Sequence, residues 1–203
     1  MSIEKNKKKT QSIVTTALFA AIIVVLQLFV TLPPIGSFYI TLSLVPIVLG
    51  AVLYGPVQGA VLGLVLGLCV SYQVINMPDP MSALMFQQTP FLTIFLCLLK
   101  TTVAGYVSGL VYKLLSKKNK SLGVIIASAL CPIINTGIFC TALFTVYNGI
   151  LNGQAAAAGK ASGLAFVFAF IILTNFVPEF IINVLLSPVI VRVSDAVSKI
   201  IKK

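Results

Sequence analysis

The amino-acid sequence predicts an all-α integral membrane protein with six transmembrane helices and with both termini in the cytoplasm. Hydrophobic residues make up 59% of the 203 positions and charged residues only 9%, which leaves too little polar surface to coat a water-soluble globule. The apolar runs are long, and basic residues interrupt or flank them in three clusters. Each cluster holds four of the 14 Lys and Arg residues: Lys5, Lys7, Lys8 and Lys9; Lys113, Lys117, Lys118 and Lys120; and Arg192, Lys199, Lys202 and Lys203.

These clusters predict the orientation of the chain and the number of crossings. Positively charged loops stay on the cytoplasmic side, so all three clusters are expected inside, and an even number of crossings must separate each pair. Six apolar stretches satisfy this condition within a single transmembrane domain over residues 1–203. The net charge of +10 is interpreted as orientation and as contact with anionic lipid headgroups, and not as a nucleic-acid-binding surface.

The first three spans are predicted at residues 11–31, 41–54 and 56–75. The first follows a lysine-rich start, but it is longer than the apolar core of a usual secretory signal and lacks an obvious cleavage site, so we expect a membrane span. The second and third are separated only by Gly55-Pro56, a helix stop followed by a residue suited to a new first turn. These two spans are therefore expected to form a helical hairpin.

The last three spans are predicted at residues 85–115, 122–148 and 163–191. The connections that then face outside, at 32–40, 76–84 and 149–162, are rich in Pro and Gly, so little regular structure is expected in them. The segment from Gln154 to Ala158 is expected to be the most mobile. These connections act either as a lid over a cavity or as simple linkers.

Several kinds of chemistry have no support in the sequence. Histidine is absent, and the four cysteines form no CxxC pair, so neither a metal site nor a bound cofactor is indicated. No phosphate-binding GK[ST] motif occurs, because the Gly159-Lys160 pair is followed by Ala161. The protein is therefore expected not to be an enzyme, and any ATP-driven work must come from another subunit.

Four polar residues inside the predicted spans are candidate substrate-binding residues: Lys100, Asn135, Asn175 and Glu179. Polar groups are costly inside a membrane and need a protein partner or a ligand. Asn175 and Glu179 are four residues apart and share one helix face. Lys100 either forms an ion pair with Glu179 or meets the anionic part of a bound metabolite. Asn135 either contacts the ligand or forms an interhelical hydrogen bond.

Two further candidate contacts lie near the outer boundary. Gln88, at the outer end of the fourth span, either binds the ligand or contacts water at the membrane interface. Tyr39 is a candidate too, although an interfacial aromatic belt is the ordinary reason for tyrosine at Tyr39, Tyr72 and Tyr147. In the first span, Ala17 and Ala21 form a small-xxx-small face that permits close approach of another helix.

These features resemble the S component of an energy-coupling factor (ECF) vitamin transporter. The resemblance rests on TALFAA in span one, the hairpin ITLSLVPIVLGAVLYGPVQGAVLGLVLGL and the later LLKTTVAGYVSGLVYKLL. It implies a multi-pass subunit of the plasma membrane that binds a vitamin from outside and works with a transmembrane T component and two cytoplasmic ATPases. It further implies that Ala17 and Ala21 dock on the T component, and that the pocket lies in spans four to six and the first outer loop.

The segment CPIINTGIF around Asn135 is most similar to pantothenate-type S components. The absence of tryptophan argues against a pocket built on indole stacking, as for thiamine, and a pocket with one cation and several amides suits the small anion pantothenate. Riboflavin, folate or another micronutrient remains an alternative. So does a self-sufficient proton-coupled carrier in which Glu179 cycles its proton. An intramembrane enzyme has the least support.

Overall fold

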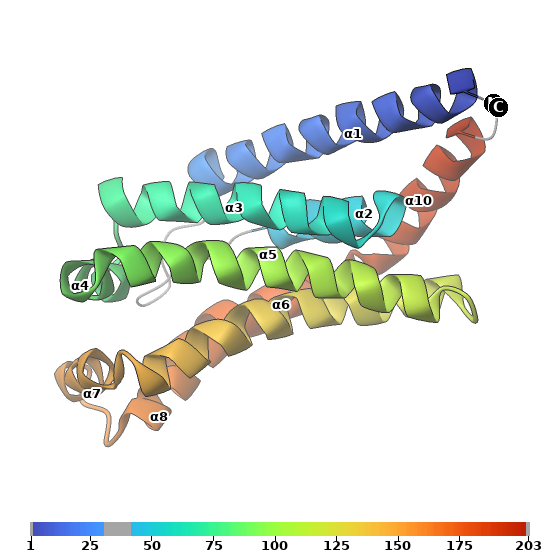
Figure 1. Ribbon diagram of the computed structural model, residues 1–203. Helices are drawn as coiled ribbons and strands as arrows, with labels where there is room; N and C mark the ends of the chain where they lie inside the picture. Colours follow the sequence, from blue (N-terminus) through green and yellow to red (C-terminus); the bar gives the residue numbers. More distant parts are fainter. Residues whose placement is uncertain (1, 31–41, 202–203) are drawn as a thin grey trace.

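A computed structural model describes residues 2–30 and 42–201, with side chains for residues 10–30 and 42–197. All regular elements in this part of the chain are helices, as the sequence predicts (Figure 1). Five helical segments are long and apolar enough to cross a membrane, and α2 (Leu44–Tyr54) is a shorter apolar helix. The five are Thr10–Phe29, Pro56–Asn76, Pro90–Leu115, Lys120–Thr145 and Gly163–Leu185.

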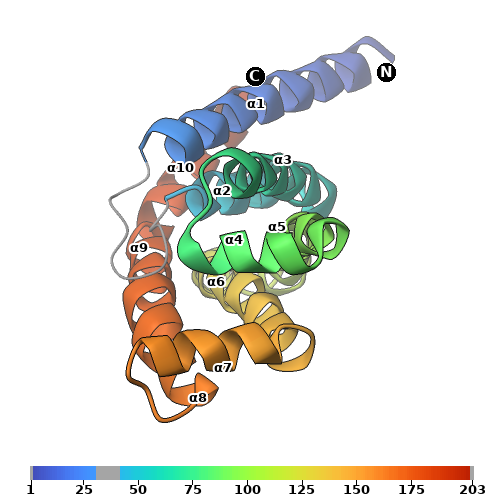
Figure 2. The ribbon, with the colours of Figure 1, turned by 90° about the vertical axis from the view of Figure 1, so that its left-hand side faces the viewer.

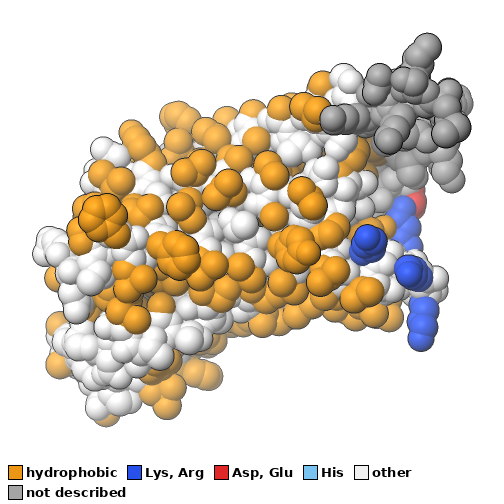
Figure 3. Space-filling view, in the orientation of Figure 1, with side chains coloured by type: hydrophobic (Ala, Val, Ile, Leu, Met, Phe, Trp, Pro, Cys, Tyr) orange, Lys and Arg blue, Asp and Glu red, His pale blue; other side chains and the backbone are white. Residues whose placement is uncertain are grey.

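The two ends of the helix bundle differ in charge. The turn between α5 (Pro90–Leu115) and α6 (Lys120–Thr145) lies at the same end as the start of α1 (Ser2–Phe29) (Figure 1). On the face shown in Figure 3, Lys and Arg side chains gather at this end, which we call the basic end. The short helices α4 (Pro80–Gln88) and α7 (Asn148–Ala157) lie across the opposite end (Figure 2). The charge separation expected from the sequence is thus present.

The predicted break between the second and third spans is confirmed. Helix α2 ends at Gly55, whose φ of 98° is a backbone conformation that favours glycine. Pro56 opens α3 (Pro56–Asn76), where the missing N–H costs nothing because the first turn has no intrahelical acceptor. The result is a tight hairpin at the basic end.

Glycines bring α3 and α5 into close contact. A Cβ atom added to Gly63 would collide with the carbonyl oxygen of Thr101, and one added to Gly67 would lie 2.7 Å from Thr101 Oγ1. Gly59 meets the backbone of Gly105 in the same way. Small residues at four-residue spacing permit such backbone contact inside a membrane. This packing fixes the rotation of α5 and therefore the direction in which its polar residues point.

The expectation of little regular structure in the outer connections is wrong for two of them. Helix α4 starts at Asp79, whose side chain accepts hydrogen bonds from the N–H groups of Met81 at 3.0 Å and Ser82 at 2.9 Å. It ends at Thr89, before Pro90 opens α5, so the predicted span at 85–115 is two helices. Helix α7 includes most of the segment that was expected to be mobile, because alanine favours the helix and Gly159 ends it only afterwards.

The sixth predicted span, 163–191, is also not one regular helix. It comprises α8 (Gly163–Phe166), the π-helical segment η1 (Val167–Phe176) and α9 (Val177–Leu185), and α10 (Ser187–Ile201) follows. Pro178 has no N–H to donate, and the N–H of Val177 reaches back five residues to the carbonyl of Ile172. A proline and a widened turn disturb the α-helical ladder, so this span changes geometry midway.

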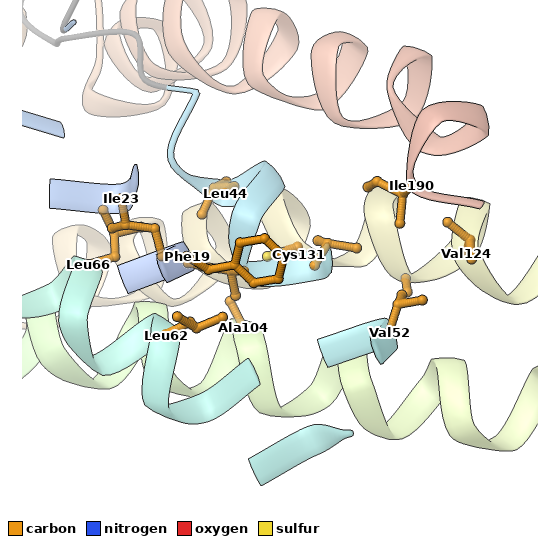
Figure 4. Close-up of a cluster of buried hydrophobic side chains, with 13 residues drawn as sticks. Phe19, Ile23, Leu44, Val52, Leu62, Leu66, Ala104, Val124, Cys131 and Ile190 are labelled. Atoms are coloured by element: carbon orange, nitrogen blue, oxygen red, sulfur yellow. The ribbon is translucent and has the colours of Figure 1, made fainter. Parts of the chain in front are cut away.

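Two hydrophobic clusters lie along the bundle. One joins α1, α2, α3, α5, α6 and α10 through buried residues such as Phe19, Leu62 and Cys131 (Figure 4). The other joins α4, α5, α6, α7 and the last span through residues such as Met85 and Tyr147. A cavity lies among α3, α5, α6 and neighbouring helices, between the two clusters. Residues from both clusters line it.

Candidate functional site

A cavity of about 120 Å³ lies among α1, α3, α4, α5, α6 and the last span. Apolar side chains including Leu66, Leu96 and Ile171 form part of its wall. The polar lining consists of Gln27, Gln73, Asp79, Ser82, Thr93, Lys100, Thr101, Asn135, Thr136, Asn175 and Glu179. Lys100, Asn135, Asn175 and Glu179, which are far apart in the sequence, therefore meet around one cavity. A mainly apolar cavity with a few polar groups is the usual form of a small-molecule site.

Lys100 is the basic residue of the cavity lining. It lies near the middle of α5, and its Nζ atom lies 4.8 Å from the centroid of the Phe139 ring. Within the part of the chain whose side chains are described, Lys100 forms no salt bridge with a carboxylate. The ion pair between Lys100 and Glu179, one of the two expectations for this lysine, is thus not formed. A cation–π contact stabilises the ammonium group but leaves its charge unneutralised.

Asn135 contributes an acceptor to the cavity. Its Oδ1 atom is buried and has no hydrogen-bond partner, although more than nine in ten buried polar groups in proteins have one. The interhelical hydrogen bond considered for this residue is absent from the described part of the chain. A ligand that donates a hydrogen bond would satisfy this oxygen.

Glu179 and Asn175 line the cavity from the last span, on one side as their spacing predicts. Glu179 is only 4% exposed. One turn further along α9, the Asn183 amide donates a 2.9 Å hydrogen bond to the backbone oxygen of Glu179. This contact holds the backbone that carries the carboxylate. The Glu179 carboxylate is thus a second hydrogen-bond acceptor in the cavity lining, in addition to Asn135 Oδ1.

Two glutamines of the cavity lining were not among the predicted site residues. Gln27 of α1 donates a 2.7 Å hydrogen bond to Gln73 Oε1 of α3, and the Gln73 amide donates a 2.9 Å bond to the backbone oxygen of Gln27. The signal was present in the sequence, because an amide in an apolar span needs a partner as much as Asn135 does. The hydroxyls of Thr101 and Thr136 were missed because threonine is common in membrane helices.

Two predicted site residues are not placed at the cavity. Gln88, at the end of α4, is exposed and does not line it. Tyr39 lies outside the described residues, together with the predicted loop 32–40.

Of the tyrosines expected in an interfacial aromatic belt, Tyr72 is exposed, whereas the burial of Tyr147 contradicts the expectation for that residue. Tyr72 is 54% exposed, as an interfacial residue should be, whereas Tyr147 is fully buried. The Tyr147 hydroxyl lies 2.8 Å from Thr89 Oγ1 and 2.9 Å from Thr93 Oγ1. These three hydroxyls join the start of α7 to the junction of α4 and α5. Thr93, one of the three, also lines the cavity.

Ala17 and Ala21 are exposed on α1. The buried positions of the same helix, Phe19, Ile23 and Gln27, lie on its other side, since successive residues turn by about 100°. The alanine face is therefore exposed on the part of the chain that the structure describes.

The composition of the cavity lining limits the ligands that it can hold. Among the described residues, no group of three or more His, Cys, Asp and Glu side chains is placed to hold a metal ion. The lining combines one cation, two carboxylates, several neutral hydrogen-bonding side chains and apolar walls, which is the make-up of a site for a small polar organic molecule.

The family model described as "ECF transporter, substrate-specific component" matches residues 11–191. In a search of curated proteins, no relative was found.

Proposed function

The chain belongs to the family of ECF transporter substrate-specific components, and we propose that its substrate is a small organic anion, with pantothenate as the best candidate. Members of this family are substrate-binding subunits of a transporter and not enzymes. The chain is therefore a multi-pass plasma-membrane protein that partners the T component and ATPases of an ECF module.

The main support for this proposal is the environment of the Lys100 ammonium group. Its ammonium group faces a cavity inside the bundle and forms no salt bridge with a described carboxylate. A charge held away from bulk water gains strongly from a counter-ion with good geometry. A carboxylate on the substrate would supply that counter-ion.

The other lining groups support a substrate that also carries hydrogen-bond donors. Asn135 Oδ1 and the Glu179 carboxylate accept hydrogen bonds, and apolar residues such as Leu66 and Ile171 accommodate methyl groups. Pantothenate combines a carboxylate, an amide, two hydroxyls and a pair of methyl groups.

The exposed face of α1 supports a docking role for Ala17 and Ala21. A surface of small residues lets another transmembrane helix approach closely. We expect the T component to bind there, on the side of α1 that faces away from the cavity.

Titration calorimetry on the full chain in lipid nanodiscs tests the proposal. Pantothenate should bind with saturation, and riboflavin and folate at the same concentrations should bind much more weakly. If a different vitamin binds and pantothenate does not, the substrate assignment is wrong. Mass spectrometry of small molecules that copurify with the chain provides an independent identification.

A further inference from the structure

Helix α1 is attached to the bundle by a narrow face. Its buried side chains are Phe19, Ile23 and Gln27, which are 8%, 0% and 3% exposed and recur every four residues. Large apolar residues elsewhere on the helix, such as Val14 and Phe29, are 62% and 79% exposed. These three side chains therefore form the buried part of the contact between α1 and the bundle.

Polar links hold α1 at two levels. Near the basic end, the Tyr54 hydroxyl donates a 3.0 Å hydrogen bond to Thr15 Oγ1. Near the α4–α7 end, Gln27 and Gln73 exchange the two hydrogen bonds described above. Gln27 and Gln73 line the cavity, whereas Thr15 and Tyr54 do not.

We propose that the Gln27–Gln73 pair transmits the occupancy of the cavity to α1, so that bound substrate sets the position of this helix. Each amide that faces the cavity offers hydrogen bonds both to its partner and to a ligand, so an occupant changes the geometry of the pair. The displacement reaches the opposite side of α1, where Ala17 and Ala21 lie. Gln27 thus acts as a positioning residue. This inference rests on the proposed function, because it requires a substrate in the cavity.

The absence of tryptophan from the chain permits a clean test. Phe29→Trp places a single indole on the exposed side of α1, two residues beyond Gln27. The full chain in nanodiscs is titrated with pantothenate, and then with riboflavin and folate, while binding is followed by calorimetry and indole emission by fluorescence. We expect the emission maximum to shift in parallel with binding.

Gln27 lines the cavity, so calorimetry first measures the affinity of the Gln27→Leu variant for the vitamin in this background. At vitamin concentrations that saturate the variant, the emission shift should be absent. The double replacement Gln27→Leu with Gln73→Leu leaves neither amide unsatisfied, and it gives the same result if the single variant is unstable. Tyr54→Phe is the matched control. It removes a polar link of α1 that lies away from the cavity, and it should keep the shift.

The outcomes separate the two proposals. Binding without an emission shift, or a shift that persists in the Gln27→Leu variant, overturns the inference and leaves the proposed function standing. If none of the three vitamins binds, the proposed function fails, and the inference fails with it because no loaded state exists. A shift lost in Gln27→Leu and kept in Tyr54→Phe supports the inference.

Discussion

The ammonium group of Lys100 lies 4.8 Å from the centroid of the Phe139 ring, across the gap between α5 and α6. The aromatic ring holds the cation in the cavity wall without neutralising it. The same kind of contact occurs outside the cavity, where Lys160 Nζ lies 5.5 Å from the centroid of the Phe170 ring. Lys100 lines the cavity and Lys160 does not. A substitution at Lys160 is therefore a matched control for the same substitution at Lys100.

Lys100→Gln should weaken pantothenate binding by roughly 10- to 100-fold, because a charge-assisted hydrogen bond is worth about 1.5–3 kcal/mol. Titration calorimetry measures the loss. Lys160→Gln removes a lysine with a similar ring contact outside the cavity and should leave the affinity unchanged. Equal effects of the two substitutions would show that Lys100 has no specific role in binding.

Asn135→Ala should weaken binding by about 1–3 kcal/mol, because the substrate then loses the acceptor at Oδ1. The unfolding temperature of the substrate-free protein should stay the same or rise, since the deleted oxygen has no partner there. Asn152→Ala, on the exposed surface of α7, is the control for binding. Unchanged affinity for Asn135→Ala would remove this residue from the site.

Tyr147→Phe should destabilise the α4–α7 end by about 1–3 kcal/mol, because the hydroxyls of Thr89 and the buried Thr93 lose a hydrogen-bond partner. Hydrogen exchange of α4 and α7 measures the change in local stability. Tyr72→Phe removes an exposed hydroxyl and should have little effect. Similar exchange in both variants would argue against a structural role for the three hydroxyls.

Gly63→Ala should lower stability by about 1–3 kcal/mol, since its Cβ meets the rigid backbone of Thr101 and the two helices must separate. Gly137→Ala is the control, because a Cβ there meets nothing within 4 Å. Removing this glycine should be neutral or slightly stabilising. Thermal unfolding in detergent compares the two, and equal unfolding temperatures would contradict the close α3–α5 contact.

Ala17→Trp and Ala21→Trp should abolish uptake by the complete transporter while leaving vitamin binding by the isolated chain intact. A large ring prevents the close helix approach that small residues allow. Leu18→Trp introduces the same ring at a neighbouring exposed position off the alanine face and should reduce uptake much less. Loss of vitamin binding in the alanine variants would mean that they disturb the fold instead.

The local features of the fold could be predicted because each depends on adjacent residues. Apolar length identifies the helices that cross the membrane, and Gly55-Pro56 ends one helix and starts the next. The predictions of secondary structure were wrong where neighbouring residues favour different local structures. Pro and Gly in the outer connections suggested irregular structure, but Asp79 and Pro80 start α4, and the alanines of α7 favour a helix.

The sequence by itself determined that this is a helical membrane protein with a basic end, and which costly polar groups require a partner, because hydropathy and charge act locally along the chain. Only the tertiary structure decided that Lys100, Asn135, Asn175 and Glu179 share one cavity with Gln27 and Gln73, while Gln88 lies outside it. The direction in which a helical side chain points depends on how the helix is rotated. That rotation is set by contacts between distant segments, such as Gly63 against Thr101.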